Sequence, residues 1–145
     1  MAIKVIVLLK RKPGMTPEAF RHAYETGHAR LAVKLFGHLW IAYRRHYLGS
    51  ANSFVDVKGA PAEGSIAEIS AAPFDVLTEL VFENAAALEE MNRIVAQNRA
   101  LLAEDEERMF DRPNCLLVMC DTVEEDLSRS RLASPGTGAV SADQT

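Results

Sequence analysis

The chain has 145 residues, of which 48% are hydrophobic, so one domain can bury a core without disulfides or metal ions. Its 16 basic and 20 acidic side chains give a net charge of -4, which argues against a nucleic-acid-binding protein because such proteins present a basic face. No segment reaches the roughly 18 apolar residues of a membrane-spanning helix, so we expect no membrane segment.

Two features of the sequence predict a cytoplasmic protein. The apolar run at the N-terminus precedes the basic residues at 10–12, which reverses the order found in a secretory signal peptide. Cys115 and Cys120 are the only cysteines, and in one extended strand they lie too far apart to form a disulfide with each other. Reduced thiols are typical of cytoplasmic proteins.

The hydrophobic periodicity predicts six elements in chain order. They are a strand over 3–10, a helix over 17–35, a strand over 38–48, a strand over 74–82, a helix over 85–108 and a strand over 114–123. The first strand is apolar on both faces, which is typical of a strand that is covered from both sides. Thr16 and Asn84 stand where helix N-caps are favoured, and Gly37 stands where the first helix is expected to end.

Two segments carry no strong periodicity. Residues 49–73 are rich in Gly, Ala, Ser and Pro, and loops of this length are often lids or binding loops. We expect at most a short strand over 53–57 within this loop. The small, polar composition after residue 126 predicts a disordered tail over 126–145, which leaves one domain over 1–125.

The order of elements, βαββαβ, is that of the ferredoxin-like α+β fold, in which two helices cover one face of a four-stranded antiparallel sheet. The doubly apolar first strand then leaves an apolar surface on the other sheet face. Two such sheets packed across a two-fold axis would cover it, so we expect a homodimer in the form of a dimeric α/β barrel.

An ionisable pair falls on the buried faces of the two predicted helices. Positions 20, 24, 28, 31 and 35 lie on one helical face, and so do positions 98, 102, 105 and 109. His28 and Asp105 are therefore expected to point toward the same side of the sheet, with Tyr24 one turn before His28. A carboxylate that orients a histidine is a common acid–base unit, although the same pair also suits a purely structural contact in the core.

Further candidates lie on the predicted strands. Glu79 stands between apolar neighbours on one strand face, where it either lines a cavity or marks the dimer seam. Arg45 shares a face with Tyr43 and Tyr47, where it either binds an anionic substrate or bridges subunits. The four histidines have no metal-ligand spacing, and no phosphate-binding loop or nucleophile elbow is present, so we expect neither a metal site nor a cofactor.

Three stretches resemble the EthD family of small dimeric α/β-barrel proteins. "KRKPGMTPEAFRHAYETGH", at 10–28, is similar to the family's Lys/Arg-Lys-Pro-Gly-Met followed by a helix with Phe, Tyr and His. "AEDEERMFD", at 103–111, resembles its acidic helix end and contains Asp105 and Phe110, and "TELVFEN", at 78–84, resembles its third strand. Arg30 stands where the family often has Pro, which predicts a straight helix and an added positive charge near the pocket mouth.

The resemblance implies a ferredoxin-like fold, dimerisation through the sheets, and a cavity between sheet and helices. Relatives in the superfamily include polyketide decarboxylases and cyclases, lactone isomerases, cofactor-free monooxygenases and haem-degrading enzymes. We therefore expect a cofactor-free acid–base lyase, decarboxylase or isomerase that acts on a small aromatic or polyketide-like metabolite, anionic ones included.

In this scheme His28 moves the proton, Asp105 orients it, and Tyr24 polarises a carbonyl or phenol. Arg45 or Arg30 attracts the anion, while the other substrate contacts are expected from Tyr43, Glu79 and Phe110. Two alternatives stay open: a cofactor-independent monooxygenase of a catabolic pathway, and a non-catalytic accessory protein that binds a small molecule.

Overall fold

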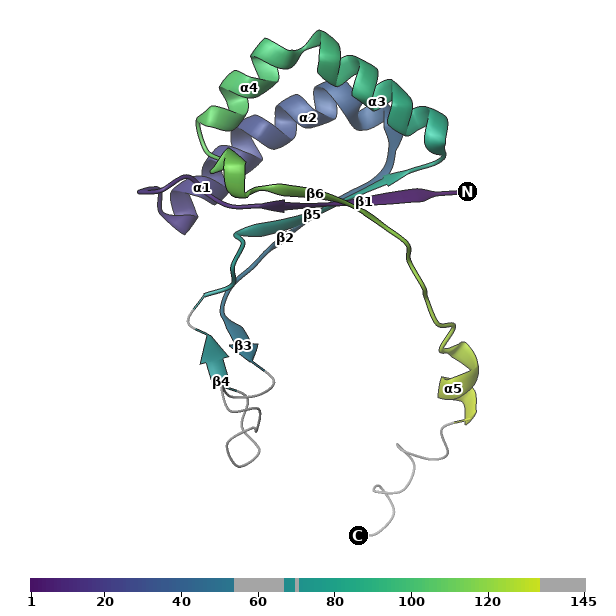
Figure 1. Cartoon of the computed structure of the whole chain (residues 1–145). Helices are drawn as coiled ribbons and strands as arrows, with labels where there is room; N and C mark the ends of the chain where they lie inside the picture. The colour runs from purple at the N-terminus through teal and green to yellow at the C-terminus, as the bar shows by residue number, and fades with distance from the viewer. Residues whose placement is uncertain (54–66, 70, 134–145) are drawn as a thin grey trace.

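A four-stranded antiparallel sheet with helices on one face forms the body of the protein (Figure 1). The structure is a computed structural model that describes residues 1–53, 67–69 and 71–133. The strands are β1 (Ile3–Leu9), β2 (Trp40–Tyr47), β5 (Val76–Phe82) and β6 (Leu116–Cys120), in the spatial order β2-β5-β1-β6. This topology confirms the ferredoxin-like α+β fold.

The helix layer consists of two helical segments, each of which is interrupted. The first contains α1 (Pro17–Ala23), a π-helical turn η1 (Tyr24–His28) and α2 (Ala29–Phe36), and the second contains α3 (Ala85–Gln97) and α4 (Arg99–Glu107). Short turns, η2 (Gly37–Leu39) and η3 (Arg112–Asn114), lead into β2 and β6. The Thr16 and Asn84 side chains accept backbone hydrogen bonds at the starts of α1 and α3, as predicted.

The first helical segment differs from the straight helix that we expected. A π turn accommodates about one more residue than an α turn, so it changes which residues face the sheet beyond it. Leu31 and Leu35 are only half-buried, whereas Ala32 and Phe36 take the buried positions. The expected stripe is therefore correct up to His28 and displaced by one residue afterwards.

The second helical segment is broken at Asn98, where a continuous helix was expected. Its backbone leaves the helical region at φ -120° and ψ 27°, and its side-chain amide donates to the carbonyl of Ile94 at 2.9 Å. The Asn98 backbone N–H donates to the same carbonyl at 3.1 Å, so this side-chain hydrogen bond accompanies the break at the end of α3.

The two segments expected to lack regular structure contain short elements. In the 49–73 segment, β3 (Ala51–Ser53) pairs antiparallel with β4 (Ala67–Ile69), and most of the strand expected over 53–57 lies outside the described residues. The tail contains a short helix, α5 (Ser128–Ala133), and residues 134–145 lie outside the description. No helix among the described residues is long and apolar enough to cross a membrane.

The sheet has one covered and one open face. Val5, Leu80 and Phe82 face the helices and are almost completely buried. On the other face, β1 and β5 present half-buried apolar side chains, and Leu116 and Val118 on β6 are 51% and 41% exposed. Within the described parts of the chain, no helix covers this second face (Figure 1).

Candidate functional site

His28 and Asp105 meet between the two helical segments, as the sequence predicted. Nδ1 of His28 lies 2.5 Å from Oδ2 of Asp105, so its N–H donates to the carboxylate. His28 is the last residue of the π turn, and Asp105 lies in the last turn of α4 with 4% exposure. A carboxylate this buried needs a partner, and the imidazole supplies one.

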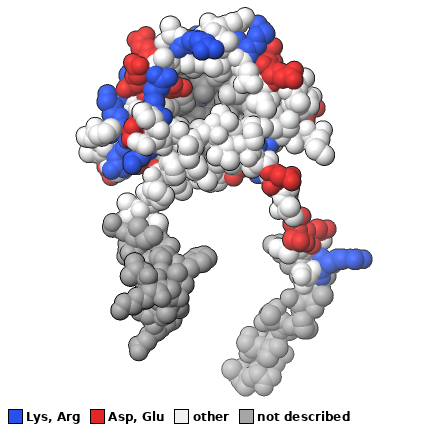
Figure 2. Space-filling view, viewed as in Figure 1, with Lys and Arg blue, Asp and Glu red and all other residues white. Residues whose placement is uncertain are grey.

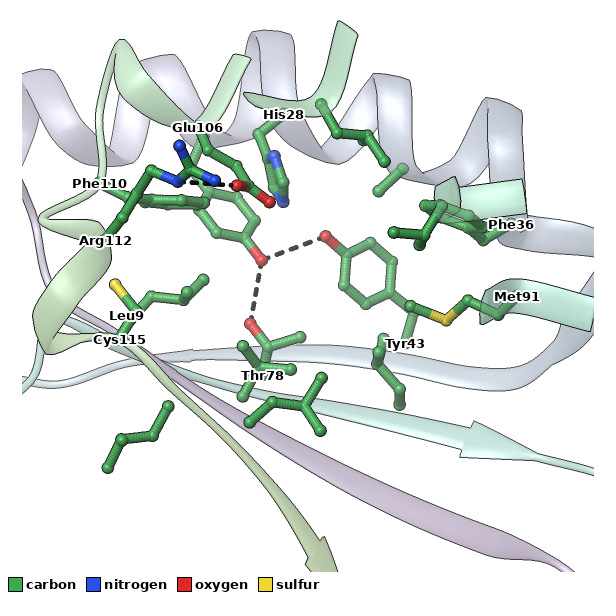
Figure 3. Close-up of a pocket in the computed structure, with 18 of the residues that line it drawn as sticks. Leu9, His28, Phe36, Tyr43, Thr78, Met91, Glu106, Phe110, Arg112 and Cys115 are labelled. Atoms are coloured by element: carbon green, nitrogen blue, oxygen red, sulfur yellow. Dashed lines mark hydrogen bonds and ion pairs between the residues drawn. The ribbon is translucent and has the colours of Figure 1, made fainter. Parts of the chain in front are cut away.

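Aromatic rings hold the His28 imidazole in position. The ring centroid of Tyr24 lies 4.9 Å from that of His28, and the ring centroid of Phe110 lies 5.0 Å from it, both in edge-to-face contacts. Figure 3 shows His28 entering the cavity from the helix layer, with its second ring nitrogen directed toward the tyrosine hydroxyls. No hydrogen bond from the described residues occupies this Nε2, so it is available to a ligand.

Two tyrosine hydroxyls and a threonine form a polar chain at the cavity wall. The hydroxyl of Tyr43 donates to that of Tyr24 at 3.2 Å, and the hydroxyl of Tyr24 lies 3.0 Å from Oγ1 of Thr78 (Figure 3). Burial raises the pKa of Tyr24 and of Tyr43 above the usual value. Both phenols therefore keep their protons at neutral pH and can donate hydrogen bonds.

The cavity has a volume of about 600 Å³, which fits a drug-sized molecule. Figure 2 shows the molecule hollowed between the helix layer and the sheet. Its walls are mostly apolar. Besides His28, the tyrosines and Thr78, the lining includes Val7, Leu9, Ala32, Phe36, Trp40, Leu80, Met91, Val95, Arg99, Leu102, Ala103, Glu106, Phe110, Arg112, Cys115, Leu116 and Leu117.

Glu79 does not face this cavity. Adjacent strand residues point to opposite faces, and Thr78 and Leu80 take the cavity side of β5. Glu79 lies on the open face, 3.2 Å from Arg44 and from His46 and 3.7 Å from Lys4. The cavity alternative for Glu79 is wrong, and the seam alternative stays a prediction.

Neither of the two arginines expected to contact substrate lines this cavity. Arg30 is exposed on α2 and is absent from the cavity lining. Arg45 binds Glu25 with both ends of its guanidinium, Nε at 2.6 Å and Nη2 at 2.7 Å from the carboxylate oxygens. This intrachain pair was not among the roles that we expected for Arg45.

The Glu25 carboxylate fastens the π turn to strand β2. Besides Arg45, the hydroxyl of Tyr47 donates to it at 2.6 Å, and the Arg45 guanidinium lies 4.6 Å from the Tyr43 ring centroid. The hydrogen bonds from Arg45, with a smaller contribution from Tyr47, lower the pKa of Glu25 to about 2. Since Glu25 belongs to the same π turn as Tyr24 and His28, this contact helps to orient both.

Four functional candidates were missed by the sequence analysis: Thr78, Arg99, Glu106 and Arg112. Period-two alternation around Glu79 would have placed Thr78 on the other sheet face. Glu106 and Arg112 form an ion pair at 3.2 Å on the cavity wall (Figure 3). No group of three or more His, Cys, Asp or Glu side chains within the described ranges is placed to hold a metal ion.

The fold and cavity define a ferredoxin-like α+β protein with a ligand-sized chamber between its sheet and helices. Residues 12–113 match the EthD domain, so the chain belongs to the EthD family, and the resemblance is confirmed. No curated protein matches the chain.

Two solved structures of one Arabidopsis thaliana protein, At3g17210, are similar to this chain. An ensemble-refined crystal structure has 16% identity and a TM-score of 0.50, and covers 86% of this chain and 99% of its own. A solution structure, described as that of a hypothetical protein, has 20% identity and a TM-score of 0.47, and covers 86% and 91%. The crystal structure supports the fold assignment and carries no information on activity.

The tyrosine environment predicts the behaviour of the protein at high pH. All three tyrosines have raised pKa values, mainly through burial, so the folded protein should show no tyrosinate absorbance near pH 10, where the unfolded chain ionises. The free energy of unfolding should also decline above about pH 10, because the unfolded chain loses its phenolic protons before the folded protein does. Below about pH 10 the stabilising contribution of these protonated tyrosines is present. An ultraviolet titration in buffer and in denaturant tests this, and a native tyrosinate signal near pH 10 would contradict it.

Proposed function

We propose that this protein is an enzyme that moves a proton on a small aromatic or polyketide-like molecule, with His28 as the base and acid. This proposal rests on the His28–Asp105 hydrogen bond of 2.5 Å, with the second imidazole nitrogen directed into a cavity of about 600 Å³. A lyase or isomerase reaction suits one such proton-transferring group.

The roles of the residues follow from their positions. Nε2 of His28 accepts a proton from an acidic C–H or O–H of the substrate, and Asp105 stabilises the imidazolium that forms. Negative charge that develops on a substrate carbonyl or phenol oxygen is stabilised by a hydroxyl of the Tyr43–Tyr24 pair. The imidazolium then returns its proton to another atom of the substrate, directly in an isomerisation or after a carbon–carbon bond has broken in a lyase reaction.

Proton exchange tests this proposal without knowledge of the natural reaction. Hydroxyacetophenone has a phenol, a ring and a slowly exchanging methyl group next to its carbonyl, so deuterium incorporation in heavy water reports base catalysis. We expect the native protein to accelerate exchange, and His28→Ala and Asp105→Asn each to remove most of this acceleration, with a loss of about 100- to 10,000-fold for His28→Ala. The double variant should be little worse than the worse single variant, since the two groups act together.

His22→Ala is the matched control, because His22 is exposed on α1 and does not line the cavity. A thermal melt of each variant separates catalysis from packing. A purely structural histidine predicts activity losses that track unfolding, and near-native exchange by folded His28→Ala would contradict the proposal. Consumption of dioxygen with a phenolic ligand would indicate the monooxygenase alternative instead, and tight ligand binding that is unchanged in His28→Ala and occurs without exchange would indicate an accessory protein.

We further propose that a second copy of this chain covers the open sheet face. This face carries the half-buried Ile6 and Leu8 and the exposed Leu116 and Val118, beside the ion pairs of Glu79 with Lys4 and Arg44. The β3–β4 pair and the segment that ends in α5 both project beyond this face, one on each side of it (Figure 1). A second sheet between these projections would remove the apolar surface from water.

Ile6→Glu tests this interface. The native protein should scatter light with twice the chain mass of 16.0 kDa at micromolar concentration, and a charge at Ile6 should give monomers or aggregates. Val33→Glu, on the 42% exposed outer side of α2, should keep the native mass. A well-folded native monomer would contradict the dimer.

We also propose a cytoplasmic location, which is supported by the free thiols of Cys115 and Cys120.

A further inference from the structure

Arg99 is a charged cavity residue whose role the proposed reaction does not explain. It is the first residue of α4 and lines the cavity although its side chain is also exposed to solvent, and no carboxylate among the described residues lies within salt-bridge distance of it. Arg112, the other lining arginine, is paired with Glu106 at 3.2 Å and with Glu107 at 3.3 Å. Of the two arginines in the lining, Arg99 is therefore the one whose charge no carboxylate of the described residues neutralises.

The unpaired charge of Arg99 selects among ligands. A molecule that fills the mostly apolar cavity removes water from the side of Arg99 that faces it. For a neutral ligand this loss of hydration has no compensation, whereas a carboxylate forms charge-assisted hydrogen bonds with the guanidinium. An anionic ligand is therefore favoured over a neutral molecule of the same shape.

The position of Arg99 along α4 fixes which end of the ligand carries the charge. Arg99 precedes Asp105 by six residues, which corresponds to about 9 Å along a helix axis. Helical side chains lean toward the N-terminus, so the Arg99 side chain leans farther from the His28–Asp105 pair. The carboxylate and the reacting group of one ligand are then separated along the direction of α4.

We propose that Arg99 binds the carboxylate of an aromatic or polyketide-like acid, whose hydroxyl or carbonyl end reaches His28 and the tyrosine pair. This inference rests on the proposed use of the cavity as the substrate site. The carboxylate at Arg99 positions the substrate and stays in the product. The reaction at His28 is then an isomerisation, or a cleavage elsewhere in the molecule, and loss of this carboxylate is not part of it.

Fluorescence titration with a hydroxynaphthoate and its methyl ester tests the proposal, because the two differ in charge and share their ring system and hydroxyl. The native protein should bind the acid at least about tenfold more tightly than the ester, as expected for hydrogen bonds to a charged group. Arg99→Gln should abolish this preference with little effect on ester binding, and Arg99→Lys should restore part of it. Arg93→Gln is the matched control, since Arg93 is exposed on α3 and outside the lining.

The possible results separate this proposal from the proposed function. Equal binding of acid and ester, no saturable binding of either, or a preference that survives Arg99→Gln would each overturn the role of Arg99. The preference should persist in His28→Ala, because the titration measures binding without turnover. A preserved preference with unchanged proton exchange in His28→Ala would therefore reject the catalytic assignment and keep the carboxylate site.

Discussion

The hydrogen bond between His28 and Asp105 is the contact on which the rest of the site depends. It joins the first helical segment to the second beside the cavity, between residues that lie 77 positions apart in the chain. Removal of the imidazole leaves the buried Asp105 carboxylate without its hydrogen-bond donor, a loss that typically costs about 1–3 kcal/mol and more for a charged group. The same contact fixes the imidazole with its N–H toward Asp105, so the opposite nitrogen faces the space where a ligand can bind.

The π turn explains how one short segment serves both packing and chemistry. It contains Tyr24, Glu25 and His28, which point to three different partners: the hydroxyl chain, strand β2 and α4. π turns occur frequently at functional sites, since the wider turn redirects side chains that a regular helix would align. The double hydrogen bond from Arg45 to Glu25 holds this turn against the sheet, so a residue outside the cavity contributes to the geometry inside it.

The sequence predicted the fold and the centre of the site, because both depend on simple periodicities. Helical spacing alone placed Tyr24, His28 and Asp105 on buried faces, and period-two alternation correctly grouped Glu79 with its apolar neighbours. Alternation does not say which sheet face a group occupies, so the cavity alternative for Glu79 stayed open until the strands were placed. The pairing of Arg45 with Glu25 was not predictable from periodicity, because it depends on how the first helical segment lies against β2.

The cavity-lining role of Arg99 was missed for a related reason. The helix breaks at Asn98, and the side-chain hydrogen bond that accompanies this break has no counterpart in the hydrophobic pattern. Periodicity across such a break does not report the direction of the following turn. Ion pairs such as Glu106–Arg112 depend in the same way on a turn, η3, whose geometry the sequence does not specify.

The protonation pattern of the His28 imidazole, observed by NMR in protein with isotope-labelled histidine, tests the role of the His28–Asp105 hydrogen bond. At neutral pH we expect a proton on Nδ1, shifted strongly downfield by the hydrogen bond to Asp105, and an Nε2 signal that moves when a phenolic ligand enters the cavity. The downfield proton should disappear in Asp105→Asn, while the signals of the exposed His22 stay unchanged. A proton on Nε2 alone, or an imidazole whose signals do not respond to ligand or to Asp105→Asn, would show that Asp105 does not orient His28.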